Sequence, residues 1–75
     1  MKYSKSIEFG KNLRAERARR SLSLEALGII ANLNPSHIGK IERAEMSPTL
    51  PTILSLLEAL DINFETLVKI NKTNT

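Results

Sequence analysis

Leucine and isoleucine recur at intervals of three and four residues along almost the whole chain, and this spacing constrains its fold more than any other feature. Side chains at those intervals share one face of an α-helix, so each run predicts an amphipathic helix. No stretch alternates β-branched with polar residues in the manner of a half-buried strand. The chain has only 75 residues, which suffice for one domain. The sequence therefore predicts an all-α fold, a compact bundle of five short helices.

Side chains that can cap a helix stand at the expected start of four of these helices. Pro35 and Pro51 then fall in the first turn of the third and fourth helices, where a missing N–H does no harm. The first helix is expected to end near Arg20. Each capping side chain can accept a hydrogen bond from the backbone of the turn that follows it. The four capping residues are Ser23, Asn34, Thr49 and Asn63.

The apolar residues of these helices are expected to form one core, which must be aliphatic because the chain has only three aromatic residues. That core is expected to span about residues 7–70 of a single domain, 1–75, with a polar tail that frays at 71–75. The positions expected to face inward are Phe9, Leu13, Leu27, Ile30, Ala31, Ile38, Ile41, Leu50, Ile53, Leu54, Leu57, Leu60, Phe64, Leu67 and Val68.

Several classes of function are excluded by what the chain lacks. It has no cysteine and only one histidine, His37, so neither a disulfide scaffold nor a protein-made metal site is expected. It has no Gly-rich phosphate loop, and its carboxylates are expected at helix caps or on solvent faces, so we expect neither a cofactor nor catalysis. Charges and hydroxyls break every apolar run at the start of the chain, which argues against a signal peptide or a membrane span. We expect a small cytoplasmic protein.

Positive charge is concentrated at the start of the chain. Residues 1–20 carry a net charge of +5, whereas residues 21–46 and 47–75 each carry −1. Such a distribution is typical of a domain that meets a polyanion with one face. The same lysines and arginines could instead form the solvated side of an amphipathic first helix, and charge alone leaves both interpretations open.

Two short helices joined by a tight turn, the second starting at Asn34-Pro35, form the pattern of a helix-turn-helix. The segment SLEALGIIANLNPSHIGKIERA, residues 23–44, resembles the phage-repressor and Cro-like helix-turn-helix family, also called the xenobiotic-response-element (XRE) family. The resemblance extends over about residues 9–68 and implies a lambda-repressor-like bundle that binds double-stranded DNA and regulates transcription. The matching positions are Ser23, Glu25, Leu27, Ala31, Leu33, Ile38, Ile41, Glu42 and Arg43.

The chain departs from the usual family pattern at several helix ends. Ser21, Asn32 and Ala44 stand where the family usually has glycine, and of these Asn32 tolerates a positive φ best whereas Ala44 is harder to place. Leu24 replaces a glutamine that braces the third helix and reaches a phosphate in relatives. Gly28 replaces a packing alanine, which keeps the close approach of two helices but lowers helix propensity.

The resemblance implies that the third helix enters the major groove and reads base edges. Lys40 could donate to guanine, Ser36 to any base pair, and Gly39 is expected to let the helix approach the groove closely. Alternatively, Lys40 is simply solvated and Ser36 belongs to the cap of the helix. The base-contacting candidates are Pro35, Ser36, His37 and Lys40. The phosphate-contacting candidates are Asn34 and Arg43 from the resemblance, and Lys11 and Arg14, with Lys2 and Lys5 of an N-terminal arm, from the charge distribution.

Arg17 and Glu42 are charged residues on otherwise inward-facing stripes of the first and third helices. In the family the corresponding pair ties these helices together through a partly buried ion pair, and the resemblance implies the same structural role here.

Some apolar residues are left over once the inward stripes are assigned. Leu56, Ile62, Phe64 and Ile70 gather on the last two helices, where members of the family pair as two-fold dimers, so we expect a homodimer on a roughly palindromic operator. The alternative is an antitoxin-like or other protein-interaction module that binds a protein partner through Leu24, Ile29 and Ile30.

Overall fold

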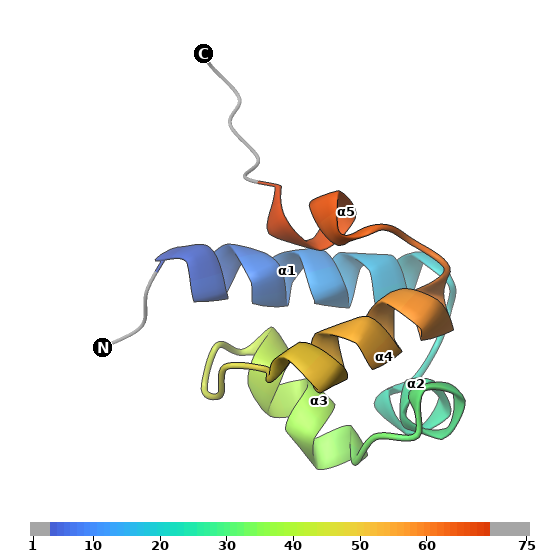
Figure 1. The fold of residues 1–75 in the computed structure, drawn as a ribbon. Helices are drawn as coiled ribbons and strands as arrows, with labels where there is room; N and C mark the ends of the chain where they lie inside the picture. Colours follow the sequence, from blue (N-terminus) through green and yellow to red (C-terminus); the bar gives the residue numbers. More distant parts are fainter. Residues whose placement is uncertain (1–3, 70–75) are drawn as a thin grey trace.

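The computed structural model describes residues 4–69, which form five α-helices joined by short turns (Figure 1). No strand occurs in this part of the chain, so the prediction of an all-α bundle of five helices is confirmed. Ile70 and the expected tail 71–75 lie outside the described residues. The helices are α1 Ser4–Arg19, α2 Leu24–Ala31, α3 Pro35–Glu42, α4 Leu50–Leu60 and α5 Phe64–Val68.

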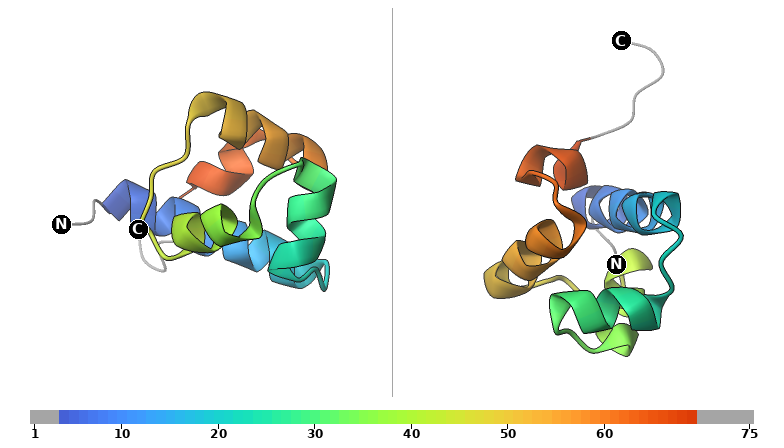
Figure 2. Two further views of the ribbon diagram at one scale, coloured as in Figure 1. Left: turned by 90° about the horizontal axis from the view of Figure 1, so that it is seen from below. Right: turned by 90° about the vertical axis from the view of Figure 1, so that its right-hand side faces the viewer.

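The longest helix, α1, lies between α5 on one side and α3 on the other (Figures 1 and 2). The second helix packs on both α3 and α4, so the chain closes around a single core. The α2–α3 pair therefore stands at the opposite side of α1 from α5.

The four predicted caps all start the helices expected of them. The side chain of each capping residue accepts a hydrogen bond from a backbone N–H two or three residues further on, because the first turn of a helix has no partner for that donor. In each pair the first residue accepts through its side chain and the second donates through its backbone N–H: Ser23 and Ala26 at 3.0 Å, Asn34 and Ser36 at 2.8 Å, Thr49 and Thr52 at 3.3 Å, and Asn63 and Thr66 at 3.2 Å.

Among residues 4–69, four residues other than glycine adopt a left-handed backbone conformation, and each follows the end of a helix. Ser21, Asn32 and Ala44 have φ of 55°, 58° and 60°, so the three positions where the family usually has glycine keep the conformation that favours glycine. Asp61, with φ of 56°, makes the same turn after α4. Ala44 therefore turns the chain as a glycine would, despite its Cβ.

The buried core is smaller than the sequence predicts, and α4 meets it with only part of the expected stripe. Leu60 is buried, and Ile53 and Leu57 pack against the core, as predicted. Leu50 and Leu54 are 66% and 52% exposed, whereas Leu56 is fully buried. The expectation that Leu56 lies on the outer surface, at a dimer interface, is therefore wrong. Ile30, Phe64 and Val68 were also expected inside but are exposed. The buried apolar residues are Phe9, Leu13, Leu27, Ala31, Ile38, Ile41, Leu56, Leu60 and Leu67.

Two glycines allow helices to approach each other closely. A Cβ at Gly10 would lie 2.5 Å from the carbonyl oxygen of Glu42, and one at Gly28 would lie 2.7 Å from that of Leu33. Neither position has room for a methyl group. Gly28 thus permits the close approach expected of it, here to the residues that enter α3.

A carboxylate is buried near the end of α1, although carboxylates outside the Arg17–Glu42 pair were expected at helix caps or on solvent faces. Glu16 is 5% exposed and accepts hydrogen bonds from Arg19 at 2.5 Å and Arg20 at 2.8 Å. The hydrogen bond from Arg20, followed by that from Arg19, holds the pKa of Glu16 below its ordinary value, although burial opposes the shift.

This lowered pKa predicts a loss of stability in acid. The folded protein holds Glu16 ionised more strongly than the unfolded chain does, so the contribution is complete above the ordinary pKa of 4.5 and disappears as the pH falls through the folded value. Urea denaturation between pH 7 and pH 3 should show a shallower decline in the free energy of unfolding for Glu16→Gln than for wild type. Parallel curves for the two proteins would contradict this role.

Candidate nucleic-acid interface

The third helix presents a polar side to solvent and an apolar side to the core. Ser36, Lys40 and Arg43 follow one another at helical spacing and are all exposed. His37 is exposed beside them. The opposite side of the helix carries the buried residue Ile38 and its neighbour Ile41. The structure thus brings four of the predicted DNA-contacting residues onto one accessible helix face.

The remaining predicted base contact, Pro35, and the predicted phosphate contact Asn34 lie at the start of α3. Pro35 is half-buried, and its ring carbons stand 3.1–3.3 Å from the position of a Cβ on Gly28, so part of the ring faces α2. Asn34 is exposed, and its side-chain oxygen caps the helix. The amide NH2 group of Asn34 remains the chemical donor suited to a phosphate.

Gly39 is buried between two side chains. A Cβ built there would lie 3.1 Å from the side chain of the exposed Arg43 and 3.4 Å from that of Leu24. That Gly39 lets α3 approach the groove stays a prediction. Leu24, which replaces the family's glutamine, braces α3 at this point by apolar contact.

Arg43 has an acidic neighbour on the same surface. Its Nε and Nη2 donate to the two carboxylate oxygens of Glu45 at 3.0 Å and 3.3 Å, and this hydrogen bonding raises the pKa of Arg43. Both side chains are exposed. A phosphate group that contacts Arg43 must compete with this carboxylate, so the net attraction of the site depends on displacing Glu45.

Arg17 and Glu42 join α1 to the end of α3. The Nε of Arg17 donates to Glu42 Oε2 at 2.6 Å, and its Nη2 donates to Oε1 at 3.0 Å. The two side chains are 16% and 6% exposed, and Nη1 of Arg17 also donates to the carbonyl of Leu22 at 2.8 Å. The hydrogen bond with Glu42 raises the pKa of Arg17. This two-point contact fixes the orientation of α3 on α1.

The basic residues of the first helix do not form one surface. Arg17 is paired with Glu42, and Arg19 and Arg20 are paired with Glu16, so three of the seven positive charges in residues 1–20 neutralise carboxylates. Lys11 and Arg14 are exposed. Arg14 follows Gly10 by one turn and therefore lies toward α3, whereas Lys11 lies further round α1.

Exposed apolar residues of α4 and α5 make a second notable surface, which we call the α4–α5 face: Leu50, Ile53, Leu54, Phe64 and Val68. Leu50 and Leu54 are one turn apart on α4, with half-buried Ile53 beside them. Of the residues expected at a dimer interface, Phe64 is half-exposed and belongs to this face, and Ile62 is partly buried against the core.

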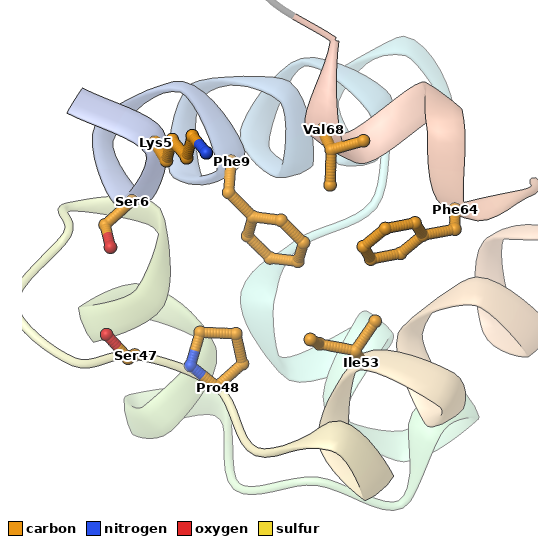
Figure 3. A pocket seen from close by; sticks show the side chains of 8 residues that line it. All are labelled: Lys5, Ser6, Phe9, Ser47, Pro48, Ile53, Phe64 and Val68. Carbon is orange, nitrogen blue, oxygen red and sulfur yellow. The ribbon is translucent and has the colours of Figure 1, made fainter. Parts of the chain in front are cut away.

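Figure 3 shows the cleft at the edge of the α4–α5 face, with a volume of about 510 Å³. The rings of Phe9 and Phe64 lie opposite each other across it, and Pro48 and Ile53 close one side. The signal in the sequence was an excess of apolar residues on α4, which are too many for one core-facing stripe.

Among residues 4–69 no group of three or more acidic or histidine side chains could hold a metal ion. In the same part of the chain, none of the helices combines the length and the apolar character that crossing a membrane requires.

A short helix pair at a tight turn, its second member exposed and anchored by a buried ion pair, defines a DNA-binding protein of the helix-turn-helix class. The chain belongs to the helix-turn-helix domain family, whose model matches residues 8–67. It is similar in structure to the restriction-modification controller protein C.AhdI from Aeromonas hydrophila, with 37% identity and a TM-score of 0.83 over 87% of this chain and 98% of that one.

A relative in sequence is the control protein C.SmaI from Serratia marcescens. The two are 39% identical over 51 residues, which is 68% of this chain but 61% of the length of C.SmaI. Together with the family match, these similarities confirm the resemblance to the XRE family of helix-turn-helix regulators that bind DNA.

Proposed function

We propose that this protein is a controller of a restriction-modification operon, which binds a roughly palindromic operator as a homodimer with α3 in the major groove. The observation that carries this proposal is the exposed face of α3. This helix is anchored to α1 by the Arg17–Glu42 pair, yet the side chains of Ser36, His37 and Lys40 have no partner among the described hydrogen bonds and ion pairs. The similarity to the controller protein C.AhdI supports the type of operon.

The side chains of this face are suited to reading a short half-site. The major groove admits one α-helix, and Lys40 can donate to O6 and N7 of guanine. The hydroxyl of Ser36 can donate or accept at either base pair, and the exposed part of Pro35 can contact a thymine methyl. A face with one strong donor discriminates modestly on its own, so specificity requires two such half-sites.

The α4–α5 face supplies the surface for pairing two chains. An exposed group of large apolar residues is typical of an interaction surface in a small protein. If two copies pair there about a two-fold axis, each contributes the same α4–α5 face to the interface. The two α3 helices then lie on one side of the dimer. A spacing of about 34 Å between them would match one turn of DNA. This assignment keeps the expected dimer but replaces Leu56 with Leu50, Leu54 and Val68.

A salt titration of binding to the DNA upstream of the gene tests the proposal. We expect specific binding whose affinity falls steeply with salt, because phosphate contacts release counterions. Lys40→Ala should weaken specific binding by about 5- to 150-fold, the loss expected for one good base contact. The control is Lys69→Ala, which removes the same charge at the end of α5, on the opposite side of α1 from α3. It should change affinity by less than about threefold.

Two results would contradict this function. Affinity that does not change with salt would exclude binding through phosphates. Equal affinity for the upstream DNA and for unrelated DNA would exclude an operator.

A protein partner is the second candidate function, and the outer side of α2 favours it. Ile29 and Ile30 are adjacent and are 81% and 54% exposed. An Ile29→Glu variant that keeps operator binding but no longer controls its operon in cells would indicate a protein partner at this site.

A further inference from the structure

Asn12 is a buried polar residue in the middle of α1, 5% exposed. Its side-chain Nδ2 donates to the main-chain carbonyl of Leu67 at 2.9 Å and to that of Lys69 at 2.7 Å. These acceptors stand at the end of α5, 55 and 57 residues further along the chain. One amide group of α1 thus caps the last carbonyls of a helix to which it does not belong.

The fifth helix needs such a contact to keep its place. It has only five residues, too few for a stable isolated helix. The last carbonyls of any helix have no partner within it, and here Asn12 supplies the donor for two carbonyls that would otherwise face α1 unsatisfied. Apart from its cap at Asn63 and the buried side chain of Leu67, α5 is exposed on most of its positions. The position of α5 along α1 therefore depends on this amide.

The same stretch of α1 also positions α3, the helix proposed to enter the major groove. Gly10, two residues before Asn12, lets the end of α3 approach so closely that a Cβ there would lie 2.5 Å from the carbonyl oxygen of Glu42. Since α3 and α5 lie on opposite sides of α1, the segment 10–12 fixes both helices relative to each other (Figures 1 and 2).

We propose that Asn12 is a positioning residue for pairing: it places Phe64 and Val68 of the α4–α5 face relative to α3, and so sets the spacing of the two recognition helices in the dimer. This inference rests on the dimer of the proposed function. Asn12 itself belongs neither to the α4–α5 face nor to the DNA-facing side of α3. Its role in this inference is to match the dimer to the spacing of the two half-sites.

The test compares Asn12→Leu, which keeps the size of the side chain but removes both donors, with wild type. Sedimentation equilibrium should show a dimer dissociation constant raised at least about tenfold, because two carbonyls lose their partner and α5 loses its place. Affinity for DNA that contains a single half-site should stay within about twofold, since Gly10 and Arg17 still hold α3. Discrimination between operators whose half-sites differ in spacing by one base pair should decrease. The control Ala15→Leu adds a leucine on the exposed side of α1 and should change none of these quantities.

Each alternative result is distinct. An Asn12→Leu protein that pairs as tightly as wild type overturns the inference. A single half-site affinity that falls as much as the pairing affinity also overturns it, because Asn12 would then only support the fold. A wild-type protein that stays monomeric without any substitution refutes the dimer of the proposed function itself. If Asn12→Leu does not fold, Asn12→Ser keeps one donor and should show intermediate pairing with full half-site affinity, and unchanged pairing would overturn the inference.

Discussion

Replacing Glu42 by alanine is expected to lower the free energy of unfolding by about 3–5 kcal/mol. The substitution leaves the guanidinium of Arg17, which is 16% exposed, without the carboxylate that receives two of its hydrogen bonds. A charge held in such a place without its partner is poorly solvated. Urea denaturation followed by circular dichroism measures the change.

The exposed pair of Arg43 and Glu45 provides a matched control for this prediction. It is also a two-point contact between arginine and glutamate, but both side chains are about half-exposed. Glu45→Ala should change the free energy of unfolding far less than Glu42→Ala does, because water solvates the remaining arginine. Equal effects of Glu42→Ala and Glu45→Ala would show that burial of the Arg17–Glu42 pair contributes nothing to stability.

The substitutions Leu56→Ala and Leu54→Ala should have opposite consequences although the two residues are two positions apart on α4. Leu56 is fully buried, so its truncation should lower the free energy of unfolding of the monomer by about 2–5 kcal/mol. Leu54 is 52% exposed, so its truncation should change that quantity by less than about 1 kcal/mol. In the dimer, Leu54→Ala should instead raise the dissociation constant about tenfold.

Two measurements separate these effects. Denaturation at a protein concentration below the dimer dissociation constant reports the stability of the monomer, and sedimentation equilibrium of folded protein reports pairing. A large loss of monomer stability with Leu54→Ala, or weak pairing with stable monomers for Leu56→Ala, would reverse the assignment of the two sides of α4.

The starts of the helices could be predicted from sequence because capping is a local interaction. Ser23, Asn34, Thr49 and Asn63 bind backbone groups only two or three residues away, so the pattern of residue types contains the whole interaction. The same reason explains the helix ends at Ser21, Asn32 and Ala44, where the family pattern marks a turn whichever residue occupies it.

The orientation of α4 could not be predicted in this way. Apolar residues occur on nearly every side of this helix, so two stripes satisfy the helical period equally well. Periodicity then identifies a helix but does not say which stripe meets the core. Leu50 and Leu54 of the stripe that the sequence suggested are exposed, whereas Leu60 of that stripe and Leu56 outside it are buried.

The polar residues inside the fold were missed for a related reason. Asn12 and Glu16 look like members of a solvated helix face, because burial of a polar residue depends on partners elsewhere. The partners of Asn12 are backbone carbonyls 55 and 57 residues away, and a carbonyl has no signature in sequence. Of the candidate DNA contacts, the sequence could place those on α3 by helical spacing.

The left-handed turns within residues 4–69 are all made by residues with a side chain, whereas the three glycines of the protein lie inside α1, α2 and α3. Holding an alanine such as Ala44 at positive φ raises the energy of the folded state by about 1–2 kcal/mol. The same side chain restricts the unfolded chain, so folding loses less entropy than it would with a glycine turn, a gain of about 0.4–1 kcal/mol. The two effects partly offset each other, and the turns can therefore lose their glycines at little net expense. Gly10 and Gly28 have no such compensation: they widen the unfolded ensemble, and they are required because the helix crossings leave no space for a methyl group.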